Sequence, residues 1–177
     1  MVNAHTDLSA DEVREYLGYD QETGIFRWRA KVGTRGRQRV GEIAGRADNS
    51  ARGGGRIFVS IGAKNYLLHR LAWLLVHGHW PSGVIDHIDG DPSNNRISNL
   101  RDVSQAVNMQ NRKGPTEKNA IGLLGVVRSS SVRKGDRFVA YITVNRRGRN
   151  LGTFDTPEAA HAAYLDAKRR LHEGCTL

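Results

Sequence analysis

The stretch VIDHIDGDPSNNRISNLR at residues 84–101, followed by SQAVN at residues 104–108, decides the fold of the region around it. A short apolar run ends in a carboxylate and an imidazole side by side, Asp86 and His87. Gly90 then breaks the strand and opens an Asn-rich loop, which leads to a second short strand and to a helix that carries another Asn. The order predicts a compact strand–loop–strand–helix unit with its polar side chains at one end.

These residue types suit the hydrolysis of a phosphodiester bond, which needs an activated water and neutralised charge on the phosphate and the leaving oxygen. A neutral His near its own pKa can take the proton from that water. A hard cation such as Mg²⁺ keeps several waters, so one carboxylate and one amide oxygen are a sufficient share from the protein. Neighbours on a strand point to opposite faces. Asp86 and His87 could therefore serve the metal and the water only if the strand ends or twists there.

The same stretch resembles the HNH nucleases, in the phage and mobile-element homing-endonuclease branch where the last His of the motif is an Asn. The resemblance covers residues 66–113 and includes LHRLA at residues 68–72 and HG at residues 77–78. It implies a ββα-metal unit in a DNA endonuclease that uses one divalent metal ion, with Mg²⁺ the expected ion and Mn²⁺ the alternative. The implied activity is hydrolysis of double-stranded DNA at a recognised site.

Carried over by position, the resemblance assigns roles to four residues. His87 would be the general base, and Asp86 one metal ligand. Asn99 would be the central Asn that holds the loop and orients the His, and Asn108 on the helix would be the second metal ligand. All four positions are filled in order, which favours an active enzyme.

Other interpretations remain open beside this one. A calcium loop fits poorly, because Asp86, Asp89 and Asp91 lack the alternating ligand spacing and the closing Glu of an EF-hand. A sequence-specific DNA-binding regulator with an inactive nuclease fold is the main alternative, and an RNA-binding protein is a third. His69 is as easily a core or capping residue as a functional one.

Composition limits the class of protein. A chain of 177 residues makes one large domain or two small ones. The longest apolar candidate, residues 67–76, is interrupted by His69 and Arg70, so no membrane span is expected. The N-terminus shows no signal-peptide pattern, which predicts a cytoplasmic protein that is not secreted. The single Cys175 excludes a disulfide framework and a four-Cys zinc site.

The formal net charge of +9 and the pI near 10.2 predict a polyanionic partner. Residues 27–56 hold nine basic and two acidic side chains, and residues 121–177 hold ten basic and five acidic. Residues 57–108 hold four of each. The predicted catalytic unit is therefore flanked by two basic segments, which favours contacts to phosphates.

Local patterns predict the elements of the N-terminal half. Ser9 and Glu12 form the capping-box pattern of a short helix, and the strand at residues 25–28 follows a turn. Residues 33–55 show little periodicity, so we expect a mobile basic loop there. A strand at residues 56–61 and a helix at residues 66–77 come next. The composition of residues 110–120 predicts a polar linker around Gly114-Pro115.

The C-terminal part predicts three strands and one helix. The strands fall at residues 125–127, 137–144 and 149–154, and Thr156 with Pro157 marks the helix start. That helix should bury Ala160, Ala163, Tyr164, Ala167 and Leu171. Along the second strand, Phe138, Ala140, Ile142 and Val144 should face the helix, and Arg137, Tyr141, Thr143 and Asn145 should face away.

Residues 121–174 resemble the Apetala, or ethylene-response-factor, DNA-binding domain, most specifically in LGTFDT at residues 151–156 and AAHAAY at residues 159–164. Members of that family lay their sheet in the DNA major groove. The base-reading Arg and Trp of the plant domain are replaced here, so base specificity does not transfer. The expected DNA contacts of the whole chain are Arg27, Arg29, Arg35, Arg37, Arg39, Arg128, Arg133, Lys134, Arg137, Tyr141, Thr143, Asn145, Arg147, Arg149 and Asn150.

The resulting prediction is an α+β protein of two modules. Residues 1–109 would be the HNH nuclease module with its basic N-terminal segment, residues 110–120 a linker, and residues 121–177 a three-stranded antiparallel sheet packed on one helix. The first module would cut double-stranded DNA and the second would help to choose where. A monomer is the preferred oligomeric state.

Overall fold

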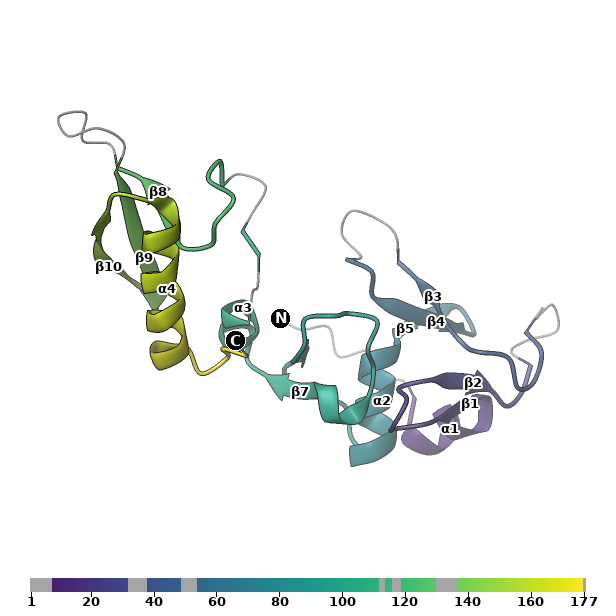
Figure 1. Ribbon diagram of the computed structural model, residues 1–177. Helices are drawn as coiled ribbons and strands as arrows, with labels where there is room; N and C mark the ends of the chain where they lie inside the picture. Colours follow the sequence, from purple (N-terminus) through teal and green to yellow (C-terminus); the bar gives the residue numbers. More distant parts are fainter. Residues whose placement is uncertain are drawn as a thin grey trace. The chain divides into compact units, whose positions relative to one another are not determined.

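The computed structural model describes residues 8–31, 38–48, 54–111, 114–115, 119–129 and 137–176. The chain forms two compact units, Met1–Gln105 and Ala106–Leu177. Both combine helices with antiparallel sheets (Figure 1), which confirms the α+β prediction. The second unit begins before the predicted linker at residues 110–120. No helix in the described part of the chain is both long and apolar enough to span a bilayer.

The first unit opens with helix α1 (Ala10–Tyr16), whose N-terminus confirms the predicted capping box. The Ser9 hydroxyl accepts a hydrogen bond from the Glu12 amide at 3.2 Å, and the Glu12 carboxylate accepts one from the Ser9 amide at 2.6 Å. The chain runs directly from α1 into β1 (Leu17–Tyr19), which pairs antiparallel with β2 (Phe26–Trp28). This hairpin carries two of the first unit's buried aromatic side chains.

A three-stranded antiparallel sheet follows in the order β3 (Arg46–Ala47), β4 (Ile57–Ile61), β5 (Lys64–Leu67). The expectation of no regular structure over residues 33–55 is wrong for β3, because its two residues pair with β4. Residues 32–37 and 49–53 lie outside the described residues. Helix α2 spans Leu68–His77.

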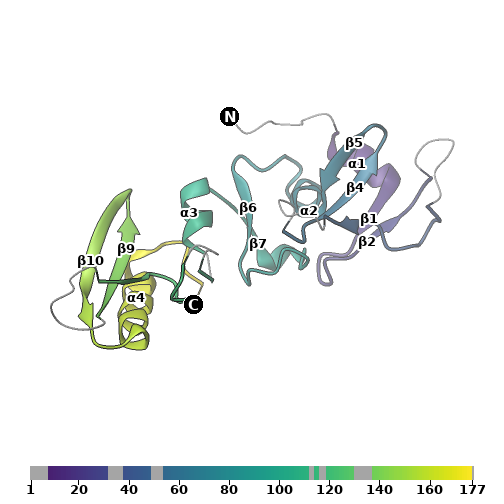
Figure 2. The same cartoon turned by 90° about the horizontal axis from the view of Figure 1, so that it is seen from above.

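The prediction that α2 begins at Tyr66 is wrong. Tyr66 pairs with Val59, and Leu67 pairs with Phe58, so both belong to β5. Their apolar side chains continue the spacing of the helix towards the N-terminus, which led to the prediction. Their backbone groups pair with the neighbouring strand β4, and this pairing determines their conformation. Figures 1 and 2 both place α2 at the centre of the first unit, beside β4 and β5 and next to the following hairpin.

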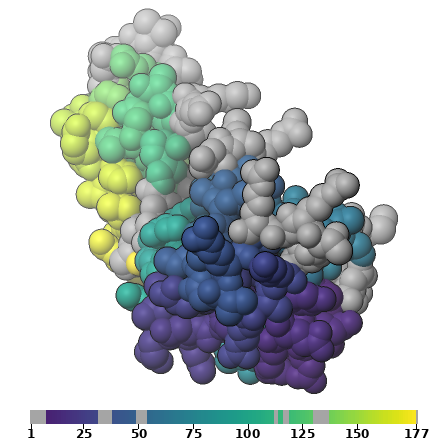
Figure 3. Space-filling view, turned by 90° about the vertical axis from the view of Figure 1, so that its right-hand side faces the viewer, coloured from purple at the N-terminus to yellow at the C-terminus, as the bar shows by residue number. Residues whose placement is uncertain are grey.

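The first unit has one core, formed by apolar side chains from α1, β1, β2, β4, β5, α2 and the strands that follow. Val13, Leu71 and Ala72 in it are fully buried. In Figure 3 the purple and dark-blue atoms of the N-terminal part of this unit lie against one another. The unit ends in a hairpin of β6 (Val84–His87) and β7 (Leu100–Val103), with the short 3-10 helix η1 (Ile97–Asn99) in its loop.

Helix α3 (Gln105–Gln110) leads from β7 into the second unit, which contains β8 (Val126–Arg128), β9 (Phe138–Val144), β10 (Arg147–Phe154) and α4 (Pro157–Leu171). The sheet is antiparallel in the order β10-β9-β8, and α4 packs against it. The Thr156 hydroxyl accepts a hydrogen bond from the Ala159 amide at 3.2 Å, so the predicted cap is confirmed. Leu171, expected to be buried, is 38% exposed, and Lys168 is buried instead.

Alternation along β9 confirms which of its side chains face α4. Ala140, Ile142 and Val144 are buried, whereas Tyr141 and Thr143 are exposed. Across the sheet, Asn150 pairs with Tyr141, and Arg149 pairs with Ile142. Facing residues of an antiparallel pair share a side of the sheet.

Two groups of predicted DNA contacts therefore lie on opposite sides of the second unit's sheet. Tyr141, Thr143 and Asn150 lie on the open face. Arg147 and Arg149 lie on the side of α4, at the edge strand β10. A Cβ atom at Gly148 would come within 1.4 Å of the Tyr141 hydroxyl, so the tyrosine ring lies across this glycine.

The β9–β10 hairpin closes through a two-residue turn. Asn145 and Arg146 have φ angles of 52° and 64°, which is the signature of a type I′ turn. Asn tolerates this left-handed region, but for Arg it costs free energy because Cβ approaches the following carbonyl.

We predict that Arg146→Gly raises the free energy of unfolding of the second unit by about 0.5–1 kcal/mol, because glycine removes the left-handed strain. Chemical denaturation followed by circular dichroism would measure it. Asn145→Gly is the matched control and should change stability by only a few tenths of a kcal/mol. A loss of stability in Arg146→Gly would contradict the turn assignment.

Candidate active site

The β6–β7 hairpin brings the residues of the central motif together. Asp86 and His87 are the last two residues of β6, opposite Arg101 and Leu100 on β7. Both side chains are buried, with residue exposures of 5% for Asp86 and 8% for His87. The strand ends at His87, as the chemistry of the pair requires.

Asp86 is paired with a cation across the hairpin. The Arg101 Nε and Nη2 atoms lie 2.8 and 2.6 Å from the same Asp86 oxygen, Oδ2. The Asp86 side chain is 6% exposed and that of Arg101 is 26% exposed. A buried carboxylate is stable only with such a partner.

The His87 ring has a hydrogen-bond partner that is not Asn99. Its Nε2 lies 3.3 Å from the Asn95 Oδ1. The Asn95 amide nitrogen donates to the Ser93 carbonyl at 3.3 Å, which leaves the amide oxygen facing the ring. The Nε2 atom therefore donates and carries the proton, so Nδ1 is the nitrogen able to accept one.

A second histidine packs against His87. The His69 ring on α2 meets it edge to face, with centroids 5.2 Å apart and planes at 89°. Its Nδ1 is buried and has no hydrogen-bond partner among the described residues. Burial, the neighbouring His87 and the charges of Arg56 and Arg70 lower the pKa of His69 to about 3. His69 is therefore a neutral core side chain behind the ring of His87.

The loop after His87 is closed by reciprocal hydrogen bonds between Asp89 and Asn99. The Asn99 Oδ1 accepts from the Asp89 amide, and the Asn99 Nδ2 donates to Asp89 Oδ1, both at 3.0 Å. The Asn99 Nδ2 also donates to the Asn94 carbonyl at 2.9 Å. Asp89 accepts further bonds from the Asn94 Nδ2 at 2.7 Å and from the Asp91 amide at 2.8 Å. Both asparagines thus fix the loop around one carboxylate.

The N-terminal hairpin supports this loop from the other side. The Tyr19 hydroxyl donates to the Asn95 carbonyl at 2.8 Å, and burial raises the pKa of that phenol. The Ile97 amide donates to the Gln21 carbonyl at 3.3 Å. Gly24 has a φ of 74°, and a Cβ there would lie 2.5 Å from the Arg96 amide nitrogen. Only glycine permits this approach of the two loops.

Comparisons with known proteins agree with this geometry. A family model described as HNH endonuclease matches residues 66–110. Protein 3.8 of Escherichia phage T7 is 31% identical over 105 residues, which cover 59% of this chain and 83% of the phage protein. The chain belongs to the HNH endonuclease family. No solved structure gives a significant match.

In this HNH protein the proposed second metal ligand, Asn108, lies on α3 and is half-buried. It belongs to the second unit, whereas Asp86 belongs to the first, so their sharing of a metal stays a prediction. Among the described residues, no group of three or more His, Cys, Asp or Glu side chains could hold a metal. One carboxylate and one amide, both hard oxygen donors, fit an ion that keeps most of its water, such as Mg²⁺.

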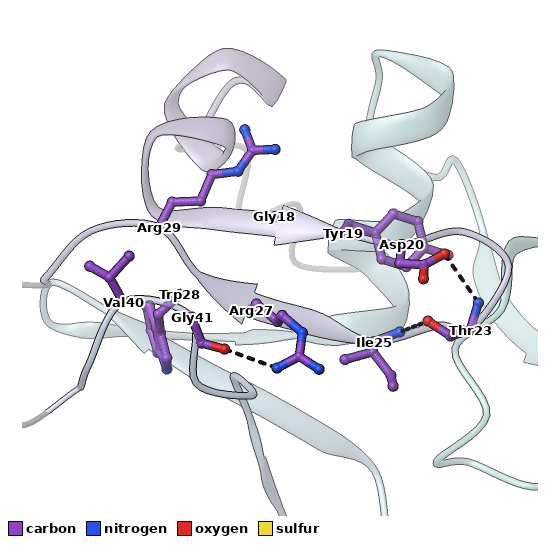
Figure 4. A pocket seen from close by; sticks show the side chains of 10 residues that line it. All are labelled: Gly18, Tyr19, Asp20, Thr23, Ile25, Arg27, Trp28, Arg29, Val40 and Gly41. Carbon is purple, nitrogen blue, oxygen red and sulfur yellow. Dashed lines mark hydrogen bonds between the residues drawn. The ribbon is translucent and has the colours of Figure 1, made fainter.

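Of the predicted basic contacts of the first unit, the described ones, Arg27, Arg29 and Arg39, lie around β1 and β2. A hollow of about 560 Å³ lies there, lined by both strands and by Val40 and Gly41. Figure 4 labels the residues that line it. The Arg27 guanidinium points to the Gly41 carbonyl and donates to it at 2.9 Å. Arg29 also lines the hollow, and Arg39 lies 4.0 Å from the Glu42 carboxylate. Arg35 and Arg37 are outside the described residues, as are Arg133 and Lys134 of the second unit.

In the second unit, two predicted contacts already have partners. Arg137 forms an ion pair with Asp155 at 3.2 Å, and Arg128 lies over the Phe138 ring at 5.8 Å. Tyr141, Thr143, Asn145, Arg147, Arg149 and Asn150 are exposed. The exposed cations of the sheet thus lie at its edge rather than on its open face.

Two site residues were missed by the sequence-based prediction. Asn95 is one of two adjacent asparagines, and nothing local says which one faces the His. Arg101 was counted as a charge but not as the partner of Asp86. The strand register supplies that signal, because Asp86 and Arg101 face each other in the β6–β7 pair.

The Asp89 carboxyl makes the stability of the folded protein depend on pH. Burial raises the pKa of this carboxyl, but hydrogen bonds from Asn94, the Asp91 amide and Asn99, with the nearby His87, outweigh burial and lower it. A lowered folded-state pKa stabilises the protein above the unfolded-state pKa of about 3.9, and the stabilisation is lost as the pH falls through the folded value.

We predict that Asp89→Asn lowers the free energy of unfolding at pH 7 by roughly 1–2 kcal/mol, since an amide cannot accept from all three donors. The difference from the wild type should shrink as the pH falls below about 5 and through the lowered pKa of the folded-state carboxyl, where the wild-type group becomes protonated. Urea titrations across this range measure it. A difference that stays constant with pH would mean that the Asp89 charge does not stabilise the loop.

Proposed function

We propose that this HNH endonuclease hydrolyses phosphodiester bonds of double-stranded DNA with His87 as the general base and one divalent metal ion, Mg²⁺ or Mn²⁺. The observation that carries the proposal is the end of β6, where a buried carboxylate and a buried imidazole stand side by side. The family match over residues 66–110 supports the reaction class. We expect a homing-type enzyme that acts at a recognised site.

The contacts of His87 suit a general base. Because Asn95 accepts from Nε2, the ring holds the tautomer whose Nδ1 can take a proton from water. His69 packs against the ring and, being neutral, adds no charge that would oppose the imidazolium formed in the reaction. Asn99 acts at a distance, by fixing the loop that carries Asn95.

The metal would be held by Asp86 and Asn108, together with water and the DNA phosphate. When bound, a divalent ion neutralises charge on the phosphate and the leaving oxygen. The protein's share is to supply one buried carboxylate from β6 and one amide from α3. Water and phosphate oxygens would supply the other ligands, which suits an ion such as Mg²⁺ that keeps most of its water.

The second unit is proposed as a DNA-docking module, similar to the Apetala-type domain. Tyr141, Thr143 and Asn150 on its exposed face would contact a DNA groove. Arg147 and Arg149 at its edge would bind DNA phosphates. Contacts to phosphates contribute to the affinity for DNA, and contacts to base edges in the groove determine the preferred sequence. The alternative function is a DNA-binding regulator with an inactive nuclease fold.

Relaxation of a supercoiled plasmid with and without Mg²⁺ separates the alternatives. A nuclease converts the plasmid to nicked or linear forms only with the metal. A regulator or an RNA-binding protein leaves the plasmid intact in both cases.

We predict that His87→Ala lowers the cleavage rate by roughly 10²- to 10⁴-fold while the affinity for DNA stays near the wild-type value. Single-turnover cleavage and a gel-shift titration in Ca²⁺ measure the two quantities. His79→Ala, at an exposed histidine of the same unit, should cleave like the wild type. If His87→Ala cleaves DNA at the wild-type rate, His87 is not the general base.

The docking role predicts different effects for the edge and the open face. Exchanging Arg147 or Arg149 for Gln should reduce the slope of log affinity against log salt by about 0.9 for each phosphate that the variant no longer binds. Tyr141→Ala should reduce site preference without changing the slope. Arg170→Gln, on α4 and paired with Asp166, is the control with the same change of charge. Unchanged slope and unchanged site preference would show that this unit does not touch DNA.

A further inference from the structure

Arg101 and Asp86 form an ion pair beside the candidate active site. The two residues face each other across β6 and β7, and two guanidinium nitrogens contact a single carboxylate oxygen. Almost the whole Asp86 side chain is buried, whereas about a quarter of the Arg101 side chain is exposed. Arg101 therefore covers the carboxylate from the solvent side and supplies the positive charge that the buried Asp86 needs.

The same carboxylate is the proposed metal ligand, so a metal and Arg101 would compete for it. Two cations that share one carboxylate oxygen also repel each other strongly at such short distances. We propose that Arg101 holds Asp86 while no metal is bound, and that metal binding displaces the guanidinium towards the scissile phosphate. This inference rests on the proposed function, because it takes Asp86 as a metal ligand.

The chemistry of arginine suits both partners. Its forked N–H groups bind the oxygens of a carboxylate, and they bind those of a phosphate in the same geometry. The Arg101 side chain is partly exposed while the Asp86 carboxylate is buried, so the guanidinium remains accessible to a phosphate from the solvent. Arg101 would thus be a competitor of the metal in the free enzyme and a phosphate ligand in the enzyme–DNA complex.

This dual role predicts opposite effects of one substitution. Arg101→Gln should bind Mg²⁺ about tenfold more tightly than the wild type in isothermal titration calorimetry without DNA, because the competing cation is gone. At saturating Mg²⁺ the same variant should cleave DNA roughly 10²-fold more slowly, because the scissile phosphate has one cationic ligand fewer. A purely structural role would weaken both metal binding and cleavage.

Two control variants distinguish the possible failures. Arg96→Gln makes the same charge change at an exposed residue of the same loop, and its Mg²⁺ affinity should equal the wild-type value. Asp86→Asn should lose Mg²⁺ binding. If Asp86→Asn binds Mg²⁺ like the wild type, the proposed metal site itself fails. If Asp86→Asn loses binding but Arg101→Gln binds no tighter than the wild type, the competition is refuted and the proposed function stands.

A melting experiment keeps the proposal testable if Arg101→Gln is too unstable for calorimetry. Without metal, its buried carboxylate loses the Arg101 guanidinium, so the melting temperature should lie below that of the wild type. Adding Mg²⁺ should raise the melting temperature of Arg101→Gln more than that of the wild type. An equal or smaller rise would overturn the inference.

Discussion

The closure of the loop between β6 and β7 around the Asp89 carboxylate is the constraint on which the site depends. The carboxylate accepts N–H hydrogen bonds from three residues of the loop. The side-chain oxygen of Asn99, one of these residues, accepts a hydrogen bond from the Asp89 amide. This arrangement fixes where Asn94 and Asn95 stand, and the second of them holds the ring of His87. The orientation of His87, the proposed general base, therefore depends on hydrogen bonds within the loop as well as on its own bond to Asn95.

The loop is also held by a part of the chain far away in sequence. Tyr19 bonds to the carbonyl of the residue that contacts His87, and the tight turn at Gly24 packs on the next peptide. The N-terminal helix and hairpin therefore have a structural role besides the proposed DNA contacts of their basic residues. They pack against the loop of the candidate site, in agreement with the one core that the described residues of the first unit form from Ala10 to Leu100.

Elements with a local cause could be predicted from the sequence. Ser9 and Glu12 predict α1, alternation predicts β9, and Thr156 with Pro157 predicts α4, because each signal lies within a few residues of the element. The start of α2 could not be predicted in this way, because a neighbouring strand decides it. The partners within the site were hidden for the same reason. Which asparagine faces His87, and which arginine faces Asp86, depends on loop closure and register.

The second unit, proposed as a DNA-docking module, also contains Asn108 and most of helix α3. None of the residues of α3 is fully buried, so its position depends on specific contacts. The C-terminal segment provides them. The Gly174 amide donates to the Gln110 side chain at 2.9 Å, and the Thr176 hydroxyl bonds to Asn111. A Cβ at Gly174 would come within 2.2 Å of the Val107 carbonyl oxygen, so the segment lies directly on the helix.

This arrangement links the proposed metal site to the docking module. On the far side of the same segment, His172 lies 2.9 Å from the Thr143 carbonyl of β9. The segment thus joins the sheet that would meet DNA to the helix that would supply a metal ligand. Truncation after Asn111 would remove not only DNA contacts but also the partners of α3. Point substitutions on the sheet are therefore the cleaner way to separate binding from cleavage.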